Sequence, residues 1–410
     1  MSPAATASAS QSPRSIVIVG GGIVGASIAY YLSRATAAAA ATAAAAASRP
    51  RITLVEASAA PAPGASGKAG GFLALDWHGA ATASLAALSF KLHRQLADQD
   101  NGAEKWGYRE VETWQVNVDS SLKERNAKRT KGSPIQWLDQ DIVKSTQNMG
   151  GSGTTAQVTP RKLTQHLVDE AQDAGVETFF STRATGLEFD DAGKVTGVRV
   201  AATQGGNERT LEATDLVLAA GPWTGSLVTS LFPRKLMPSH LKGAASIDGS
   251  RAHSVILESP PAHPLSADCL FTEMAYGAGG RSAGAPELYC RPDGTAYVCG
   301  GSDDVPLPDL ADDVGFDAKK VDALIEQSRI LSPSSLDVDK GAKVVARQAC
   351  YLPISNRTGN PIVGGKDGVY VAAGHSCWGI TNSLGTGKVL AELLLDGKAT
   401  SADIRSLMPQ

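Results

Sequence analysis

The order of hydrophobic and polar positions predicts strands that alternate with helices in the first part of the chain. Residues 16–19 form a short apolar, β-branched run, and a helical segment follows them directly. Residues 51–55 and the apolar run TDLVLAA, which begins at Thr214, have the same character. Apolar runs of this length, separated by helical patterns, are typical of a parallel sheet with helices packed on it.

Amphipathic spacing predicts the longer helices. Apolar residues recur every three or four positions over residues 81–98, 159–175, 316–330 and 388–397, which places them on one face of a helix. The last helix follows the glycine-rich stretch HSCWGITNSLGTG. We interpret this stretch as a turn that either directs a helix N-terminus at a ligand or simply caps the helix. The sequence leaves both interpretations open.

Residues 235–301 have a different character. Short runs alternate between apolar and polar residues, and a Pro-Asp-Gly turn at residues 292–294 separates two of them. Alternation with a period of two, broken by tight turns, predicts an antiparallel sheet. The sequence therefore predicts an α/β domain with an inserted antiparallel sheet, which is an α+β arrangement overall.

A glycine motif after the first strand carries the clearest chemical signal. Gly20, Gly22 and Gly25 have G-x-G-x-x-G spacing, and Glu56 ends the second strand. In dinucleotide sites such glycines allow a tight turn, close approach of a pyrophosphate and helix–strand packing, while the acidic residue accepts hydrogen bonds from a ribose. Glycine-rich turns also occur for structural reasons alone, but Glu56 favours the dinucleotide interpretation. The alanine tract at residues 37–47 lengthens the gap before Glu56 and is interpreted as a helix extension or a loop.

Composition and charge narrow the classes of function. The 410 residues carry a net charge of −3 without a basic block, which argues against a nucleic-acid-binding protein. The five cysteines include no C-x-x-C pair and no Cys/His cluster, so neither a disulfide framework nor a metal site is predicted. Residues 1–14 are rich in Ala, Ser and Pro and are interpreted as a disordered tail without a secretory signal. We expect a cytoplasmic protein with no membrane insertion.

Five motifs together resemble the D-amino-acid-oxidase-like family of FAD-dependent oxidoreductases, which includes glycine and sarcosine oxidases. In chain order they are IVGGGIVGASIAYYL, GASGKAGG, DLVLAAGPW, LYCRPDGTAYVCG and GVYVAAGHSCWGI. The similarity covers nearly the whole chain, and the last motif is most similar to that of an uncharacterised fungal branch. The resemblance implies two domains. A Rossmann-like FAD-binding domain would comprise residues 15–78, 151–231 and 340–410, and a substrate domain residues 79–150 and 232–339.

The resemblance also implies a set of contacts to FAD. Motif by motif, these are Gly20, Gly22, Ile23, Val24 and Gly25 at the pyrophosphate, Glu56 at the adenosine ribose, Ser66, Gly67, Lys68 and Gly71 at the pyrophosphate and flavin, Ala184 at the adenine, Gly221 and Trp223 in the AAGPW turn, and Gly379, Ile380 and Thr381 at the isoalloxazine and ribityl chain. We expect the FAD to bind non-covalently. Some members attach FAD to a cysteine near the segment that holds Cys350, although a buried structural thiol is the alternative for this residue.

The reaction that the resemblance implies is oxidation of a C–N bond in an amino acid or a secondary amine. Hydride would pass to flavin N5, and molecular oxygen would be the final acceptor. An arginine fork is the natural clamp for a substrate carboxylate, and Arg291 and Arg347 are the candidates. Tyr289 would be a polar wall residue, and His375 would lie near the flavin. Each of the four could equally have a structural role.

The chain departs from sarcosine-type oxidases at both of their carboxylate grips. Residues 69–72 are Ala-Gly-Gly-Phe where those oxidases carry an arginine, and Thr381 stands in the place of a lysine. These departures motivate a second hypothesis, a flavin-stabilised assembly or trafficking factor with little turnover. A NAD-dependent dehydrogenase is disfavoured, because it would leave the AAGPW and GHSCWGI segments without a purpose.

Overall fold

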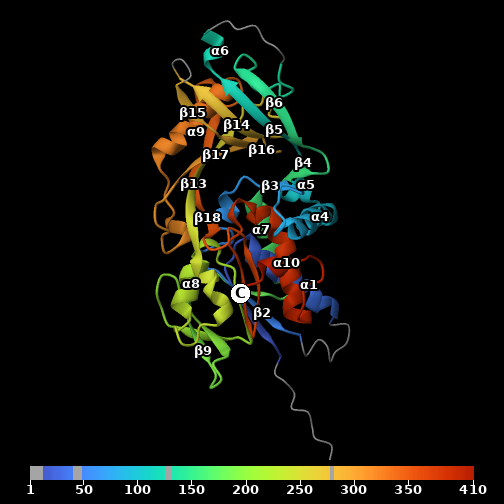
Figure 1. Ribbon diagram of the computed structural model, residues 1–410, viewed down its shortest axis with the longest axis vertical. Coiled ribbons are helices and arrows are strands. Elements are labelled where there is room, and N and C mark those ends of the chain that lie inside the picture. Colours follow the sequence, from blue (N-terminus) through green and yellow to red (C-terminus); the bar gives the residue numbers. More distant parts are fainter. Residues whose placement is uncertain (1–12, 40–48, 125–131, 278–280) are drawn as a thin grey trace, which may run out of the picture.

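The computed structural model describes residues 13–39, 49–124, 132–277 and 281–410. In these parts the molecule is elongated, with a parallel sheet in its lower half and a large mixed sheet in its upper half (Figure 1). Two predicted features fall partly outside the described residues. They are the disordered tail, of which residues 1–12 are not described, and the alanine tract from residue 40 onward.

The parallel sheet has six strands in the order β19-β20-β12-β1-β2-β8. β1 lies near its centre and pairs in parallel with β12 and β2, whereas β19 pairs antiparallel with β20 at one edge. The strands are β1 (Ser15–Val19), β2 (Arg51–Val55), β8 (Glu177–Phe179), β12 (Asp215–Leu218), β19 (Ile362–Lys366) and β20 (Val369–Ala373).

Both faces of the parallel sheet are covered, which explains the continuous apolar runs in its strands. Successive residues of a strand point to opposite faces, so Ile16 and Ile18 join the core beneath the helices while Val17 and Val19 join the core on the other side. The first face packs against α1 (Ile23–Ala39), α4 (Ala83–Asp100), α7 (Pro160–Asp173) and α10 (Gly379–Asp396). The second face packs against α8 (Thr224–Leu231) and the antiparallel strands β9 (Thr182–Phe189), β10 (Val195–Ala202) and β11 (Arg209–Glu212).

The large sheet follows the order β18-β13-β17-β16-β14-β5-β6, and β15 pairs with β14. All pairs are antiparallel except β14 with β5. Its strands are β5 (Glu112–Asp119), β6 (Val143–Gly150), β13 (Ile247–Glu258), β14 (Asp268–Tyr276), β15 (Ser282–Gly284), β16 (Glu287–Cys290), β17 (Thr295–Asp303) and β18 (Lys343–Ser355). Helix α9 (Ala318–Leu331) packs on this sheet and shares its hydrophobic core.

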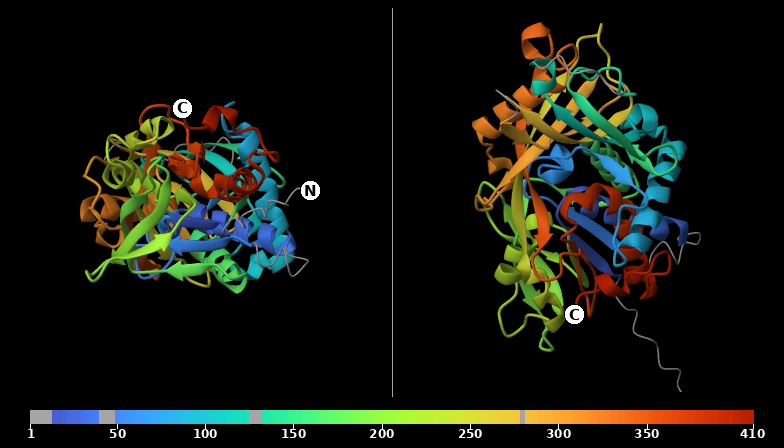
Figure 2. Two further views of the ribbon diagram at one scale, coloured as in Figure 1. Left: turned by 90° about the horizontal axis from the view of Figure 1, so that it is seen from below. Right: turned by 45° about the horizontal axis from the view of Figure 1, so that its top comes forward.

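Short elements join the two halves. A three-stranded antiparallel sheet has the order β3-β7-β4. Its strands are β3 (Phe72–Ala74), β4 (Arg109–Glu110) and β7 (Thr155–Gln157). The remaining short α-helices are α3 (Ala65–Lys68), α5 (Gly102–Lys105) and α6 (Ser121–Glu124). Two further views show that the first strands (blue) and the last helix (red), which lie far apart in the sequence, pack together (Figure 2).

The predicted fold class is confirmed, but two segments lie elsewhere than predicted. β18 pairs with β13 along its whole length and belongs to the large sheet, although residues 340–410 were expected in the domain of the parallel sheet. Conversely, Phe90, Leu96 and Ala97 of α4 belong to the core of the parallel sheet, although residues 79–150 were expected in the other domain. Neither position follows from local periodicity, because each depends on contacts between residues far apart in the chain.

Helix α10 begins at Gly379, nine residues before the start that the sequence predicts. The glycine-rich stretch there is helical because its glycines are packing positions. A Cβ on Gly387 would lie 2.3 Å from Ser27 Oγ, and a Cβ on Gly385 would lie 2.9 Å from the Leu85 carbonyl oxygen. The missing side chains therefore let α10 approach α1 and α4 closely.

Two further findings concern membrane-spanning helices and disulfide bonds. Within the described residues, no helix combines the length and the apolarity that a membrane crossing requires. All five cysteines are free thiols.

The buried His93 predicts how stability responds to pH. Its side chain is 1 % exposed and contacts the carbonyl oxygen of Ile380 through Nε2 at 2.9 Å, and burial lowers its pKa to about 4. In the unfolded chain the histidine pKa is about 6.5, so the unfolded state takes up a proton at a higher pH than the folded state. The free energy of unfolding therefore falls as the pH drops from about 6.5 to about 4. The expected loss is on the order of 2–3 kcal/mol for this residue.

We expect His93→Gln, which can still donate to the Ile380 carbonyl, to flatten the curve of unfolding free energy against pH in that window. His263→Gln is the matched control, because His263 is exposed and should leave the slope unchanged. Urea titrations at several pH values measure both, and an unchanged slope for His93→Gln would contradict the assignment.

Candidate active site

A cavity of about 1080 Å³ lies between the parallel sheet and the large sheet. Its walls include the ends of β1, β2 and β20, the N-termini of α1 and α10, and strands β16, β17 and β18. In open α/β sheets ligands bind beyond the carboxyl ends of the strands. The volume is slightly above the usual range for small-molecule sites, so the cavity is large enough for an extended ligand.

The turn between β1 and α1 forms one end of this cavity through backbone atoms. Gly20 has a φ of +117°, which favours glycine, and a Cβ on Gly25 would lie only 1.9 Å from the Gly20 carbonyl oxygen. Gly20, Gly22 and Val24 line the cavity, whereas Gly25 provides the close helix–strand contact behind it. The first helical N–H groups have no acceptor within the helix, so this end suits an anion.

Glu56 lines the same end of the cavity from the terminus of β2. Its two carboxylate oxygens accept hydrogen bonds from the backbone N–H groups of Gly21 at 2.7 Å and Ser58 at 2.9 Å. Burial raises the pKa of Glu56, and these two N–H donors oppose that shift. The carboxylate is therefore held in a fixed position from which its remaining lone pairs can accept further hydrogen bonds.

The loop around α3 contributes only part of the residues predicted there. Ser66 and Gly71 line the cavity, and the Ser66 hydroxyl accepts a hydrogen bond from the Ile23 N–H at 2.9 Å. Gly67 and Lys68 are not among the lining residues. A Cβ on Gly67 would lie 2.1 Å from the Ala62 carbonyl oxygen, which makes this glycine a packing position.

The remaining predicted cofactor residues divide in the same way. Ile23, Ala184, Gly221, Trp223, Gly379 and Ile380 line the cavity. Thr381 does not line it, because its hydroxyl is buried and donates to the Phe72 carbonyl oxygen at 3.1 Å. The structure thus brings twelve of the sixteen predicted cofactor residues to one cavity, whereas Gly25, Gly67, Lys68 and Thr381 are not part of its lining.

Two of the four candidate catalytic residues line the cavity. Tyr289 on β16 donates from its hydroxyl to Glu287 at 2.5 Å, and burial together with this carboxylate raises its pKa well above the usual value. His375 follows β20 and contacts the Thr386 hydroxyl through Nε2 at 3.1 Å. Burial lowers the pKa of His375 to about 4, so its ring is neutral at physiological pH.

The structure does not bring the two arginines into the cavity. Arg347 lies on β18 and forms an ion pair with Asp322 of α9, on the strand face opposite to Gln348 and Cys350. Arg291 is buried and donates to the Ala69 carbonyl oxygen at 3.2 Å, with its guanidinium carbon 5.5 Å from the centre of the Tyr297 ring. Neither is placed to clamp a carboxylate within this cavity.

Sequence reasoning missed an aromatic cluster that lines the cavity together with Glu287. Ring centroids in this cluster lie 5.2–6.4 Å from those of their neighbours. The cluster consists of Phe72, Trp77, Phe271, Tyr289, Tyr297 and Trp378. Glu287 could have been found from its spacing, because it precedes Tyr289 by two positions and so shares its strand face. The other aromatic residues come from four separate segments and left no local signal.

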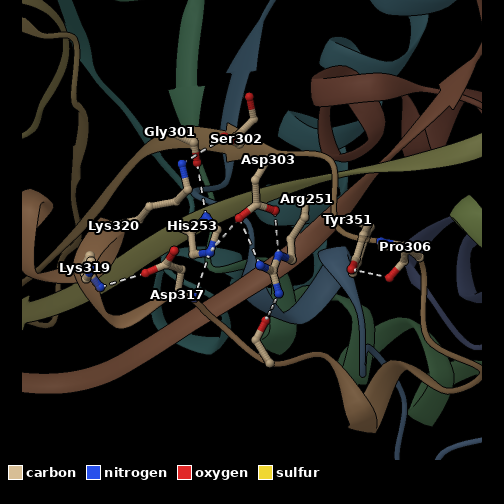
Figure 3. A network of polar contacts seen from close by, with 11 residues as sticks. Arg251, His253, Gly301, Ser302, Asp303, Pro306, Asp317, Lys319, Lys320 and Tyr351 are labelled. Atoms are coloured by element: carbon tan, nitrogen blue, oxygen red, sulfur yellow. Dashed lines mark hydrogen bonds and ion pairs between the residues drawn. The ribbon is translucent and has the colours of Figure 1, made fainter.

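Hydrogen bonds hold residues 304–317, which connect β17 to α9, along one side of the cavity. Arg251 donates to both carboxylate oxygens of Asp303, at 2.7 and 2.9 Å, and to the Gly315 carbonyl oxygen at 3.0 Å (Figure 3). Nε2 of the buried His253 accepts a hydrogen bond from the Asp317 N–H at 3.0 Å. The Tyr351 hydroxyl donates to the Pro306 carbonyl oxygen at 2.8 Å. Because Asp309 and Leu310 of this segment line the cavity, the network fixes part of its wall.

A second cluster of titratable groups lies away from the cavity, although no metal site was predicted. Asp100, His166 and Glu170 place ligand atoms within 4.8 Å of one another. His166 already contacts Asp100 at 2.8 Å, and Arg34 pairs with Glu170 at 3.0 Å. These contacts join α1, α4 and α7 and account for the arrangement.

Comparison with known proteins places this geometry in context. The model of the family described as FAD dependent oxidoreductase matches residues 15–393. A candidate oxidoreductase of Schizosaccharomyces pombe is 39% identical over 413 residues, covering 97% of this chain and 98% of its own.

Solved structures agree with the fold. Glycine oxidase from Geobacillus kaustophilus superposes with a TM-score of 0.69 at 21% identity, covering 96% of this chain and 98% of its own. L-proline dehydrogenase from P. horikoshii superposes with a TM-score of 0.70 at 15% identity, covering 97% of each chain.

The Arg251 network predicts a local effect on residues 304–317. Arg251→Met should remove the paired hydrogen bonds to Asp303 and the contact to Gly315, at a cost of about 1–2 kcal/mol in unfolding free energy. Amide hydrogen exchange should accelerate in residues 304–317 more than elsewhere. Arg329→Met is the control, because Arg329 forms an exposed pair with Glu326, worth at most about 1 kcal/mol. Equal exchange in both variants would show that Arg251 does not hold this segment.

Proposed function

The chain belongs to the FAD-dependent oxidoreductase family, and we propose that it oxidises a C–N bond of an amine or amino acid, with molecular oxygen as the final acceptor. The observation that carries this proposal is the single cavity that runs from the β1–α1 turn to the aromatic wall of the large sheet. Support for the substrate class comes from glycine oxidase and L-proline dehydrogenase, which share the fold.

The chain's own atoms fit an adenine dinucleotide at the β1–α1 end. Gly20 and Gly22 leave room for a pyrophosphate at the start of α1. Glu56 has free lone pairs for ribose hydroxyls. Ala184 would lie against the adenine, and Ser66, Gly71, Gly379 and Ile380 would surround the middle and the flavin end of the cofactor. The N-terminus of α10 adds a second positive dipole end toward the same cavity.

FAD, when bound, supplies the two-electron acceptor for the hydride that leaves the substrate carbon. The protein's part is to hold the substrate carbon against the flavin, exclude bulk water and keep the amine neutral at the moment of transfer. The neutral His375 ring contributes no charge near this position. In the overall reaction the amine, water and oxygen give a carbonyl compound, a shorter amine or ammonia, and hydrogen peroxide.

A substrate panel tests this proposal. We expect the purified protein to be yellow and its flavin absorbance to bleach under anaerobic conditions when a suitable amine is added, with peroxide released on admission of air. Matched pairs, such as proline with pyrrolidine and phenylalanine with 2-phenylethylamine, separate amino acids from simple amines. An inert panel combined with a stable co-purifying protein partner would instead support an assembly or trafficking factor with little turnover.

The attachment of the flavin is tested separately through Cys350. Cys350 lines the cavity, but burial raises its pKa to about 11, and a protonated thiol is a poor nucleophile. We expect acid precipitation to release all the flavin into the supernatant, in both the native protein and Cys350→Ala. Flavin that stays with the native pellet but leaves the Cys350→Ala pellet would demonstrate a covalent bond at this residue.

A further inference from the structure

The region of the cavity formed by β14, β16 and β17 combines a carboxylate with aromatic rings. Glu287 lines it beside the six-residue aromatic cluster defined above. The Glu287 carboxylate accepts the Tyr289 hydroxyl at 2.5 Å and lies 3.7 Å from Cys299 Sγ. Within the part of the chain that the structure describes, no lysine, arginine or histidine nitrogen lies within 4.0 Å of it. Its negative charge is therefore not neutralised by an ion pair.

The other charged side chains in the cavity come from other elements. Glu56 follows β2, Arg183 lies on β9, and Asp309 lies in the segment of residues 304–317. The Pro308 carbonyl oxygen of this segment accepts a hydrogen bond from the Trp223 ring nitrogen. Among the described residues that line the cavity, Arg183 is the one permanent cation and there is no lysine. Arg291, which does not line the cavity, donates to the Ala69 carbonyl and lies over the Tyr297 ring, while its buried Nε has no hydrogen-bond partner in the described part of the chain. The described lining beside the aromatic cluster therefore offers no lysine or arginine side chain to a carboxylate.

Aromatic faces and a carboxylate have the same electrostatic preference. The ring faces carry negative potential and attract cations, most strongly when water is excluded. A charge-assisted hydrogen bond or ion pair to Glu287 adds to that attraction. A carboxylate-bearing ligand would meet repulsion from Glu287 and would lose hydration without compensation.

We propose that Glu287 and the aromatic cluster form a cation-binding subsite, and that the substrate is a cationic amine without a carboxylate rather than an amino acid. This inference rests on the proposed amine-oxidising function and selects one of its two substrate classes. Glu287 binds the protonated nitrogen of the incoming amine, which passes its proton to this carboxylate or to water before hydride transfer, or it binds a second positive group of the same molecule. The rings enclose the alkyl or aryl groups attached to that nitrogen. Glu287 is in this sense a specificity-determining residue.

Binding of non-oxidisable probes tests the subsite independently of turnover. Choline, its neutral carbon isostere 3,3-dimethyl-1-butanol, and betaine, which replaces the hydroxymethyl group with a carboxylate, differ mainly in charge. Because a quaternary nitrogen has no lone pair, it cannot undergo the proposed amine oxidation. Calorimetry and tryptophan fluorescence on the flavin-loaded protein should show that choline binds about tenfold or more tightly than either of the other two.

Substitutions test whether choline binds at Glu287 and the aromatic cluster. Glu287→Gln keeps the size of the side chain and an acceptor for Tyr289, and should weaken choline binding about tenfold while leaving 3,3-dimethyl-1-butanol unchanged. Trp77→Leu should weaken choline binding severalfold by removing one ring. Glu273→Gln is the matched control, because Glu273 is an exposed carboxylate on strand β14 outside the cavity, and should have no effect.

Each outcome decides a separate point. Equal affinity for choline and its neutral isostere, tighter binding of betaine, or full choline affinity in Glu287→Gln would overturn the cation subsite. Flavin reduction by proline or phenylalanine but not by pyrrolidine or 2-phenylethylamine would also overturn it while leaving the proposed oxidation intact. Charge-selective choline binding without flavin reduction by any amine would support the subsite and count against the oxidation.

Discussion

Close backbone packing between strand β1 and helix α1 is the constraint on which the rest of the site depends. A Cβ at Gly25 would collide with the Gly20 carbonyl, and one at Gly20 would lie 2.4 Å from the Ala219 carbonyl oxygen. Without side chains at these points, β1, β12 and α1 meet at backbone distance, and the helix starts directly at the carboxyl edge of the sheet. Glu56 then reaches Gly21 from the neighbouring strand. The anion-favouring end of the cavity follows from this contact.

Two parts of the cavity differ in electrostatic character. The N-terminus of α1 faces one part, where negative phosphates would be stabilised. Glu287 and the aromatic rings line another part, where negative groups would be repelled. In the proposed function, the first part would hold the phosphates of the cofactor and the second part would hold the substrate.

Local sequence patterns predicted the features that depend on short spacings. They failed for residues whose positions depend on contacts between segments far apart in the sequence. Gly20, Gly22 and Glu56 were predictable because a tight turn and a strand end fix their positions within a single unit. Arg347 was misplaced because the side to which a strand residue points depends on the pairing of β18 with β13, some ninety residues away. The start of α10 was missed because Gly385 and Gly387 suggest a loop until their packing against α4 and α1 is known. The aromatic surroundings of Glu287 could not be predicted, because they form only where β3, β14 and the segment before α10 come together in the fold.

Strand β18 also connects the large sheet to the segment that precedes α10. Strands β13 and β18 pair from Ile247 with Ser355 to Glu258 with Lys343, with one register shift between Ile256 and Leu257, and they lie in the middle of the molecule (Figure 1). Immediately before its end, β18 bridges from Ile354 to His375, which precedes α10. Because β18 belongs to the large sheet and His375 follows β20 of the parallel sheet, this bridge connects the two sheets at the cavity. A shift of one sheet against the other would therefore move His375 together with the β18 residues that line the cavity.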